Sequence, residues 1–595
     1  MKLCYNPSMA DWYLIRKGGD YTAIGEKHHI HPVLARILKN RGVESDEEIE
    51  AFLHGGMECL HPAEEMKDME RCAGILLPAI REGRKIRVIG DYDIDGVCAT
   101  AILLKGLWGL GANADHCIPH RIRDGYGMNP DMIRQAAADG VEYILTCDNG
   151  ISAADEAALA KELGITLLIT DHHEPPYRMR GEEREYLLPD AAVIVDPKQS
   201  DCPYPFKGIC GAFVAAKLIG TLYRTGGTEL APSFYEELIQ LAAFATVGDI
   251  MELKDENRVL VKEGLRLLSQ RPAPGFRELI EVLGLSGKQI SSYHLGFVLG
   301  PCINASGRID TADRALELFT TDDPARARTI AGELRELNES RKSLTEQATK
   351  AAAEQIDGGE HAGMKVYVIF LPDCHESIAG IVAGRITERY EHPTLVVTKG
   401  EEGLKGSARS VPAYHMYDAL TEVAELFTRF GGHAQAAGFS LPEENLPELR
   451  RRLNENCRVK EEEMKRRVEI DLELPLKYAS PELVTELALL EPCGCGNEKP
   501  VLARQGLTLK HIRPVGQEAK LTLLAVEDEG REYELKLFFA FEELKEYLKE
   551  KHGSSAVEAL LSPQGGAVRF AGIYTPQWNE YRGERKLQLV LEDYK

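Results

Sequence analysis

Between residues 85 and 195, four short apolar stretches rich in β-branched residues are each followed by a helical pattern, and this alternation determines the fold class that we expect. Strands that alternate with helices build a parallel sheet whose crossover helices cover its faces. We therefore predict an α/β domain organised around a parallel sheet. The stretches lie at residues 85–90, 143–147, 166–170 and 193–195.

Acidic and histidine side chains gather just after three of these stretches. The carboxyl ends of parallel strands meet at one edge of an open α/β sheet, which is where such sheets bind ligands. Carboxylates that crowd together repel one another, and a divalent cation relieves this repulsion. Because the pattern recurs on neighbouring strands, we expect these groups to reach one rim of the sheet. In chain order they are Asp91, Asp93, Asp95, Asp148, Asp171, His172 and His173.

A fourth contribution comes from Asp249, which ends an apolar helical run at residues 245–248. Alone, this acid would be an ordinary charge at the end of a helix. Together with the strand-end groups it completes a mixed set of oxygen and nitrogen ligands, which suits Mn²⁺ or Mg²⁺ better than a structural zinc ion. We predict a dinuclear hydrolytic site of the kind that promotes metal-assisted displacement at phosphorus.

The rest of the chain contains two further bodies. A polar helical pattern at residues 333–355 has neither proline nor glycine and is long enough to connect two bodies. After it, strands expected at residues 365–370 and 393–397 open a second α/β segment. The C-terminal part combines a helix at residues 541–551 with short alternating strands, a pattern typical of a small OB-type barrel. Those strands are expected at residues 520–525, 533–539, 568–574 and 586–591.

These patterns divide the 595 residues into five segments. A chain about four times as long as a typical domain of ~150 residues is not expected to have a single core. In order, the segments are an N-terminal lead-in (1–80), the first α/β domain (81–320), a connecting helix (321–358), the second α/β domain (359–455), and a linker with the barrel (456–595).

The charge balance excludes some classes of protein. Acidic residues outnumber basic residues by 94 to 71, which gives a net charge of −23. This excludes a protein that coats nucleic acid through its overall charge, but it leaves room for a local basic groove. No stretch reaches the ~18 consecutive apolar residues of a membrane span, and the N-terminal residues lack the apolar core of a signal peptide. We therefore expect a cytoplasmic protein without a membrane partner.

The 13 cysteines are scattered along the chain and odd in number, which indicates reduced thiols rather than a disulfide framework. Cys493 and Cys495 form the closest pair, and one glycine separates them. A zinc site at this pair would lack nearby histidine or cysteine partners. A turn is therefore the favoured interpretation.

The motifs in this order resemble the DHH phosphoesterase superfamily, and the rest of the chain is similar to its RecJ branch, the single-strand-specific 5′ exonucleases. The match covers nearly the whole chain. It rests on Asp91-Tyr92-Asp93-Ile94-Asp95-Gly96, Asp148-Asn149-Gly150, Asp171-His172-His173 and Asp249. The resemblance implies a DHH domain with a parallel sheet, a long connecting helix, a DHHA1 α/β domain and a C-terminal OB-like β-barrel. It also implies a metal-dependent 5′-to-3′ exonuclease that degrades single-stranded DNA to nucleotides in recombination and repair.

The resemblance assigns roles to the clustered groups. Two divalent cations are implied, with Mn²⁺ favoured over Mg²⁺. Three catalytic groups, Asp91, Asp171 and His173, would be close ligands or would orient the ligands, and His173 would stabilise or protonate the leaving oxygen. The implied metal ligands are Asp93, Asp95, Asp148, His172 and Asp249.

Substrate-binding residues follow from further motifs of the same family. Arginines are suited to grip a phosphate through paired donors, and glycines allow close backbone approach. For the glycine pair at 431–432 the alternative is a tight turn, and for His433 it is a satisfied core histidine. Two departures from the family pattern bear on substrate grip and substrate length. Cys302 stands in place of an arginine, and in Cys374-His375-Glu376-Ser377 the tryptophan and the small residue that normally flank the histidine are replaced. The implied residues are Arg121, Arg308, His375, Ser407, Arg409, Gly431, Gly432 and His433.

The implied partner is single-stranded DNA, and the family adds a helicase and a single-strand-binding protein as candidates. In the barrel, Trp578 and Tyr581 offer aromatic faces for tracking the strand, although Trp578 suits barrel packing nearly as well. For the charged residues between 450 and 467, a solvated helix face is favoured over a nucleic-acid patch. Two other functions stay open: a phosphodiesterase of short oligonucleotides or cyclic dinucleotides, and a non-catalytic replication scaffold.

Overall fold

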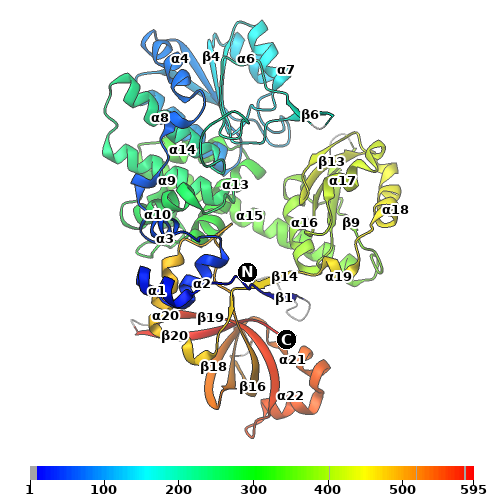
Figure 1. Ribbon diagram of the computed structural model, residues 1–595. Coiled ribbons are helices and arrows are strands. Elements are labelled where there is room, and N and C mark those ends of the chain that lie inside the picture. Colours follow the sequence, from blue (N-terminus) through cyan, green and yellow to red (C-terminus); the bar gives the residue numbers. More distant parts are fainter. Residues whose placement is uncertain (1–9, 182, 401–402, 517–518, 582–583) are drawn as a thin grey trace. The chain divides into compact units, whose positions relative to one another are not determined.

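The computed structural model describes residues 10–181, 183–400, 403–516, 519–581 and 584–595 (Figure 1). Contacts between residues divide the chain into two compact units. Unit 2 consists of His54–Ser343 together with Pro492–Glu498, and unit 1 contains the remaining residues. Among the described residues, none of the helices combines the length and the apolar character that crossing a membrane requires.

Unit 2 contains the predicted parallel sheet, with strand order β3-β2-β4-β5-β8. Four of its strands match the apolar stretches: β2 (Lys85–Ile89), β4 (Tyr143–Cys147), β5 (Thr166–Thr170) and β8 (Val193–Val195). The fifth, β3 (Asn113–Cys117), was not expected from the sequence. It lies at the edge of the sheet and pairs only with β2, and an edge strand tolerates polar residues. Because of these polar residues, the segment does not have the apolar pattern of a buried strand.

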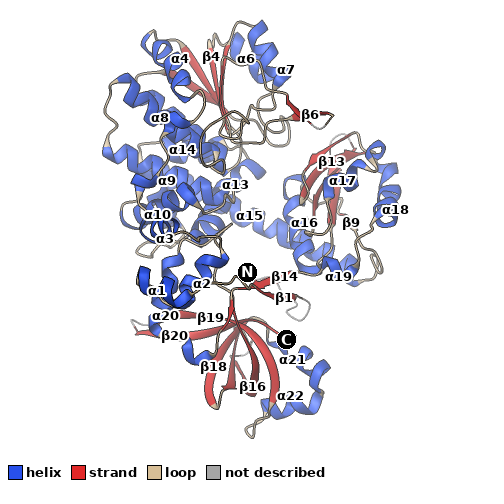
Figure 2. Ribbon diagram, in the orientation of Figure 1, coloured by secondary structure: helices blue, strands red, loops and turns tan. Residues whose placement is uncertain are grey.

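The side chains of successive strand residues are buried on opposite faces of the sheet, as the twofold periodicity of a strand requires. Val88 and Leu145 face a core shared with α5 (Ile94–Gly109) and α8 (Gly211–Gly226). Their neighbours Ile89 and Ile144 face the core beneath α6 (Pro130–Ala138) and α7 (Ala154–Glu162). Helices therefore cover both faces, and this leaves the edge formed by the strand ends for side chains with a chemical role (Figure 2).

The connecting helix, α15 (Pro324–Asp357), has 34 residues and begins nine positions earlier than the polar pattern at residue 333 indicated. Asp323 accepts a hydrogen bond from the Ala325 N–H at 2.9 Å and so caps the helix, and Pro324 occupies its first turn. The helix ends before Gly359, whose φ of +89° a helix cannot accommodate.

Unit 1 contains the second α/β body, a five-stranded sheet with the order β12-β13-β11-β10-β9. Only β9 and β10 are parallel to each other, and the remaining pairs are antiparallel. Helix α16 (Glu376–Tyr390) packs with residues of α15 on one face. The strands are β9 (Tyr367–Phe370), β10 (Thr394–Gly400), β11 (Gly403–Arg409), β12 (Arg429–Gly432) and β13 (Ala436–Leu441).

The predicted OB-like barrel is also present in unit 1. Its strands follow the order β16-β17-β18-β20-β19, and pairing between β16 and β19 closes the barrel. The longest unpredicted strand, β16, is interrupted by register shifts after Arg504 and Leu509, which break the alternation by which a strand is recognised. The strands are β16 (Leu502–Val515), β17 (Leu521–Asp528), β18 (Arg531–Phe538), β19 (Val568–Tyr581) and β20 (Glu584–Tyr594), and α21 (Phe541–His552) precedes β19.

The N-terminal residues of unit 1 form the helices α1 (Tyr21–His28), α2 (Pro32–Asn40) and α3 (Asp46–His54). Before them, β1 (Asp11–Leu14) pairs in parallel with β14 (Arg467–Ile470). The first residues of the described chain therefore join the linker that leads to the barrel.

Candidate metal centre

Three strand ends deliver the predicted acids and histidines to one edge of the parallel sheet. Asp91 follows β2, Asp148 follows β4 and Asp171 follows β5, and all three are buried. Asp249 reaches this edge from the end of α9 (Pro232–Gly248), where its Oδ2 lies 3.7 Å from Nε2 of His172. Three groups of potential ligands result, each with ligand atoms within 4.8 Å of one another: Asp91, Asp93 and Asp148; Asp95, His172 and Asp249; and Asp148, His172 and His173.

Helix N-termini orient two of the carboxylates. Asp95 accepts hydrogen bonds from the N–H groups of Gly211, at 2.6 Å, and Ala212, at 2.8 Å, where α8 begins. The partial positive charge of a helix N-terminus favours a carboxylate at this point. Asp93 caps α5, and its Oδ1 accepts the N–H groups of Asp95 and Gly96. Both side chains are therefore fixed by backbone that the fold already provides.

His172 lies at the centre of the negative charge. Its Nε2 is 3.0 Å from Oδ1 of Asp148, 3.4 Å from Oδ2 of Asp95 and 3.7 Å from Oδ2 of Asp249. Burial lowers the pKa of His172, so the ring is neutral at neutral pH and does not balance these carboxylates. A bound cation would balance them.

The carboxyl groups of the cluster have strongly shifted protonation equilibria. Burial, followed by the charges of Asp95 and Asp93, raises the pKa of Asp249 to about 8. Burial and neighbouring carboxylates also raise the pKa values of Asp91, Asp93 and Asp148. Protons are thus retained where carboxylates crowd, and a divalent cation would displace them on binding.

The donor set fits a hard divalent cation. Both carboxylate oxygens of Asp91 and Nδ1 of His172 are buried and have no hydrogen-bond partner within the described ranges. Buried polar atoms without a partner are costly unless an ion or a water satisfies them. Several carboxylates with one or two imidazoles are typical ligands of Mn²⁺ or Mg²⁺. These residues therefore form a site suited to divalent metal ions.

Asp171 differs from the acids with raised pKa values, because its own pKa is lowered. Its Oδ2 accepts the Ile151 N–H at 2.9 Å, and its Oδ1 accepts the His172 N–H and faces Nδ1 of His173, both at 2.7 Å. Burial raises the pKa of Asp171, but the hydrogen bond and charge of His173 outweigh this effect and hold it below its usual range. Asp171 therefore holds the ring of His173 and the backbone N–H groups of both histidines.

His173 is the protonated group of the site. Burial lowers its pKa, but the hydrogen bond and charge of Asp171 outweigh this effect and raise it to about 9. Because Nδ1 faces Asp171, Nε2 is the nitrogen that can present a proton to a bound molecule. The Tyr126 hydroxyl lies 3.2 Å from the ring nitrogens and donates to the Asp148 carbonyl at 2.8 Å.

Sequence reasoning missed Asp196, which follows β8 at the same edge of the sheet. Burial, followed by the charge of Asp171, raises the pKa of this carboxyl to about 7. The signal was available, since Asp196 follows a predicted strand just as Asp148 does. Sequence reasoning also missed Tyr126, because nothing in the sequence indicated its contacts with Asp148 and His173.

The segment around the predicted Arg308 supports the loop that carries Asp91, Asp93 and Asp95. Asn304, in α13 (Gly300–Ile309), accepts the Ile94 N–H at 2.9 Å. The Arg121 guanidinium stacks 3.9 Å above the ring of Tyr92, and the charge of Arg308 also acts on this tyrosine. The two predicted phosphate-gripping arginines therefore lie beside the metal-site loop.

The departure at Cys302 has a structural consequence. The Cys302 side chain is fully buried, donates to the Val298 carbonyl at 3.4 Å and accepts from Asn338 at 3.4 Å. Burial raises the pKa of this thiol to about 11. At this position the chain therefore has a neutral core side chain instead of a guanidinium.

In unit 1, three of the predicted substrate residues share one face of the sheet. Ser407 in β11 lies opposite Gly438 in β13, which in turn lies opposite Gly431 in β12. The two glycines leave the row beside Ser407 without side chains, and a Cβ at either one would meet open space. Arg409, two residues further along β11, is on the same face. The strands thus form a shallow bare surface flanked by a hydroxyl and a guanidinium.

The two predicted histidines of unit 1 differ in environment. His433 is exposed at the β12–β13 turn, which is evidence against the core-histidine alternative. His375 caps α16, and its Nδ1 lies 2.7 Å from the Ser377 hydroxyl. Ser377, the second departure from the family pattern, therefore engages the ring that was predicted to contact the substrate.

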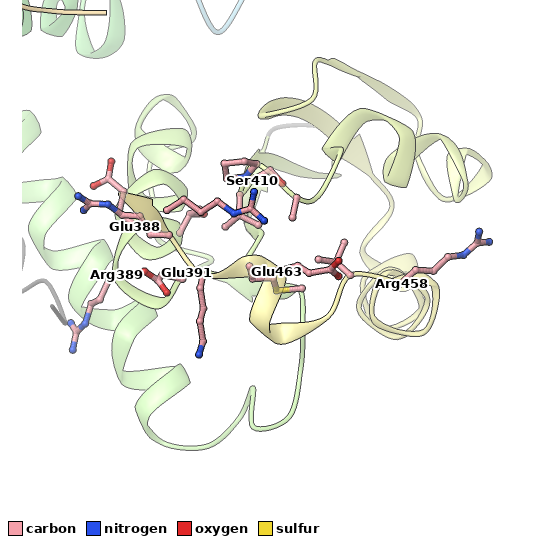
Figure 3. A pocket seen from close by; sticks show the side chains of 15 residues that line it. Glu388, Arg389, Glu391, Ser410, Arg458 and Glu463 are labelled. Carbon is pink, nitrogen blue, oxygen red and sulfur yellow. The ribbon is translucent and has the colours of Figure 1, made fainter. Parts of the chain in front are cut away.

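Two arginines of the charged segment between 450 and 467 are paired with acids. Arg451 forms ion pairs with Glu448 and Glu455, and Arg452 pairs with Glu425. This agrees with a solvated face. The part of this segment from Arg458 to Arg467 helps to line a cavity of about 800 Å³ in unit 1, together with residues 387–391 and 410–413. Figure 3 shows that Glu388, Glu391 and Glu463 stand among its arginines, so its charge is mixed and it has no concentrated anion site.

Two further sequence predictions concern cysteines and aromatics. Cys493 and Cys495 flank a turn in which Gly494 and Asn497 pair, as the favoured interpretation required. Trp578 lies in β19, and the guanidinium of Arg585 covers its ring at 4.4 Å. The side chain of Tyr581 lies outside the described residues.

Comparison with known proteins now identifies these parts. Three family models match: the DHH family N-terminal domain over residues 85–246, the DHHA1 domain over 363–458 and the RecJ OB domain over 470–593. Among solved structures, RecJ of Thermus thermophilus in complex with Mn²⁺ matches with a TM-score of 0.79 and 28% identity, and the match covers 99% of this chain and 80% of that one.

Curated relatives agree. The single-stranded-DNA-specific exonuclease RecJ of Bacillus subtilis is 36% identical over 85% of this chain, which spans 63% of that relative's length. RecJ of Haemophilus influenzae is 30% identical over 96% of this chain and 97% of its own length. The chain therefore belongs to the RecJ family of single-stranded-DNA-specific exonucleases, within the DHH phosphoesterases.

Proposed function

We propose that this protein is a hydrolase that degrades single-stranded DNA from its 5′ end to nucleotides, in recombination and repair, with the help of two divalent cations. The observation that carries the proposal is the convergence of acids and histidines at the carboxyl edge of the sheet, in a chain of the RecJ family. Crystal structures of RecJ from Thermus thermophilus are described as complexes with Mn²⁺ and with Mg²⁺. We favour Mn²⁺ for this chain.

The proposed ligands are Asp93, Asp95, Asp148, His172 and Asp249, and the unpartnered oxygens of Asp91 add a further donor. When bound, two cations would supply a nucleophile at neutral pH and stabilise the attacking and leaving oxygens of an in-line displacement. The protein contributes the fixed orientation of these groups before the substrate arrives.

Proton transfer to the leaving oxygen is assigned to Nε2 of His173. Asp171 holds Nδ1 of this ring at 2.7 Å and keeps the imidazole protonated at neutral pH. A protonated imidazole can then donate its proton to the leaving oxygen as the phosphorus–oxygen bond breaks.

We assign substrate binding to two surfaces, one in each unit. Arg121 and Arg308, beside Tyr92, would contact a phosphate near the metal-site loop. In unit 1, Ser407 and Arg409 flank the bare glycine surface on which a sugar-phosphate backbone can lie closely. The barrel offers Trp578 for base stacking, and a helicase and a single-strand-binding protein are the proposed protein partners.

The test is digestion of single-stranded DNA labelled at either end, with Mn²⁺ or Mg²⁺, beside a matched duplex and a dinucleotide. We expect the 5′ label to be released at once as mononucleotide while the duplex is spared. Cleavage of the dinucleotide alone would favour the short-substrate phosphodiesterase. No cleavage with either metal would favour the replication scaffold.

A further inference from the structure

The segment Pro492–Glu498, here called the strap, belongs to unit 2, although the residues before and after it belong to unit 1. It contains the Cys493-Gly494-Cys495 sequence, for which the proposed function has no use. The strap is a compact turn: Gly494 and Asn497 exchange backbone hydrogen bonds of 2.9 and 3.1 Å. The Asn497 side chain, which is 1% exposed, donates to the Pro492 carbonyl at 2.8 Å.

Backbone carbonyls of the strap accept hydrogen bonds from other residues of unit 2. The Leu253 N–H donates to the Cys495 carbonyl at 2.7 Å, and the Ser292 hydroxyl donates to the Cys493 carbonyl at 2.6 Å. Packing is equally close, because a Cβ on Gly494 would lie 2.7 Å from Cδ1 of Leu253. Leu253 itself is buried. The strap therefore fixes the backbone and the side chain of this leucine.

Leu253 ends the short loop that starts at the proposed metal ligand Asp249. Directly after the ligand, Ile250 has a φ of +58° and is 73% exposed. A β-branched residue strongly disfavours this left-handed conformation, and no burial of its side chain compensates for it. The Met251 N–H bond to the Thr246 carbonyl holds the loop to α9, and the strap holds its other end at Leu253.

We propose that the strap is a positioning element for the metal centre: by holding Leu253, it keeps Ile250 in its strained conformation and the Asp249 carboxylate beside His172. This inference rests on the proposed function, since it takes Asp249 as a ligand. Loosening the strap would let Ile250 relax and would withdraw one ligand. Partners that orient a metal ligand typically contribute 10- to 100-fold to metal affinity.

Two glycines provide a matched test in the full-length chain. Gly496, in the strap, has a φ of +69°, and its Cβ would lie 3.1 Å from Cβ of Glu252. Gly506, in β16, has a φ of +71°, and a Cβ there would meet nothing within 4 Å. Gly496→Ala and Gly506→Ala therefore impose the same backbone strain, but only the first pushes on the loop.

The measurement is Mn²⁺ affinity by titration calorimetry without DNA. We expect Gly496→Ala to weaken Mn²⁺ binding about 10-fold or more, and Gly506→Ala to leave it unchanged. Nuclease activity of Gly496→Ala should recover in excess Mn²⁺, with the KM for DNA unchanged. Ile250→Asn, which suits the left-handed conformation, should restore most of the Mn²⁺ affinity in the Gly496→Ala background.

Wild-type affinity in Gly496→Ala, or equal weakening in both glycine variants, would overturn the inference. Should Gly496→Ala not fold, Ser292→Ala decides the question, because it removes only the bond to the Cys493 carbonyl: weaker Mn²⁺ binding supports the strap's function and unchanged binding refutes it. Failure of the wild-type chain to bind Mn²⁺ would instead refute the proposed function and, with it, this inference.

Discussion

Asp148 and His172 are each shared by two of the three potential ligand groups, and Asp148 is the shared carboxylate, so the proposed centre depends strongly on it. We predict that Asp148→Ala abolishes nuclease activity while the fold is kept. A metal ion contributes several kcal/mol of charge stabilisation to the transition state, which corresponds to a loss of roughly 10³-fold or more. The measurement is single-turnover digestion of labelled DNA, with circular dichroism to check the fold. Asp131→Ala on α6, whose side chain is 94% exposed, is the matched control and should remain active.

A second prediction concerns the Asp171–His173 pair. In Asp171→Asn the charge that raises the pKa of His173 to about 9 is lost, while the burial that lowers this pKa remains. The charges of Asp249 and Asp95 still raise the pKa of the ring, but it should fall below the wild-type value of about 9, so activity should decline at a lower pH than in the wild type. The measurement is the pH profile of kcat in saturating Mn²⁺. Identical profiles would show that His173 is not the proton donor.

Individual residues show how much of the candidate site could be predicted from the sequence. That acids after parallel strands share one edge follows from topology, so the cluster could be predicted before any contact was known. The roles expected of Asp148 and Asp171 came from the family resemblance and not from the residues alone, because both acids stand in the same sequence context. They differ in the Ile151 N–H that reaches Asp171 from 20 residues away, and this is a tertiary contact.

At the scale of the element, two adjacent glycines of the β12–β13 hairpin have different surroundings. Gly432 has a φ of +153°, and a Cβ there would lie 2.4 Å from the Ala436 carbonyl oxygen, whereas a Cβ at Gly431 would meet open space. We predict that Gly432→Ala distorts the hairpin and lowers the melting temperature, because backbone atoms must shift. Gly431→Ala should leave the melting temperature unchanged and raise the KM for DNA, since it blocks only the bare surface. Equal effects on melting would contradict this distinction.

The N-terminal helices contain a histidine held between two acids. Nδ1 of His28 lies 2.9 Å from Oε1 of Glu50, and Nε2 lies 2.8 Å from Oδ1 of Asp46. These hydrogen bonds raise the pKa of His28 above its usual 6.5. A group with a raised pKa in the folded state stabilises that state fully below its unfolded value, and this stabilisation is lost as the pH rises through the folded pKa.

We therefore predict that α1 and α3 lose protection against amide exchange at alkaline pH, after correction for the intrinsic rate. His28→Gln should remove the pH dependence and leave low protection throughout. A pH step that persists in the variant would assign the effect to another group.

Elements were predictable where one periodicity persisted. Strands β4, β5 and β8 have the boundaries expected from the sequence, because buried parallel strands are continuously apolar. Strand β16 was hidden by its register shifts and β3 by its polar edge. The polar pattern at residues 333–355 starts later than α15, because the Asp323 cap and Pro324 lie outside the polar stretch, whereas the expected segment 321–358 contains the whole helix.

At the scale of the whole molecule, the chain has a net charge of −23 and yet belongs to a family that acts on a polyanion. Its overall field opposes DNA, so we expect binding to come from a few local cations. Each phosphate that these cations contact releases counterions from the DNA, and this release sets the salt dependence. For single strands the slope of log K against log salt is about −0.7 per phosphate contact. A low slope is therefore expected, in contrast to proteins that coat DNA.

The last prediction assigns one of these contacts to Arg409. In an Asp148→Ala background, which we expect to bind DNA without digesting it, Arg409→Ala should reduce the steepness of the salt dependence by about 0.7 and weaken binding to all sequences alike. Arg451→Ala is the control, because that guanidinium is already paired with Glu448 and Glu455 and should not contact phosphate. Fluorescence anisotropy of a labelled oligonucleotide across a salt series measures both. An unchanged slope in Arg409→Ala would remove Arg409 from the DNA path and would leave its neighbour Ser407, with the bare glycines, to bind the backbone without charge.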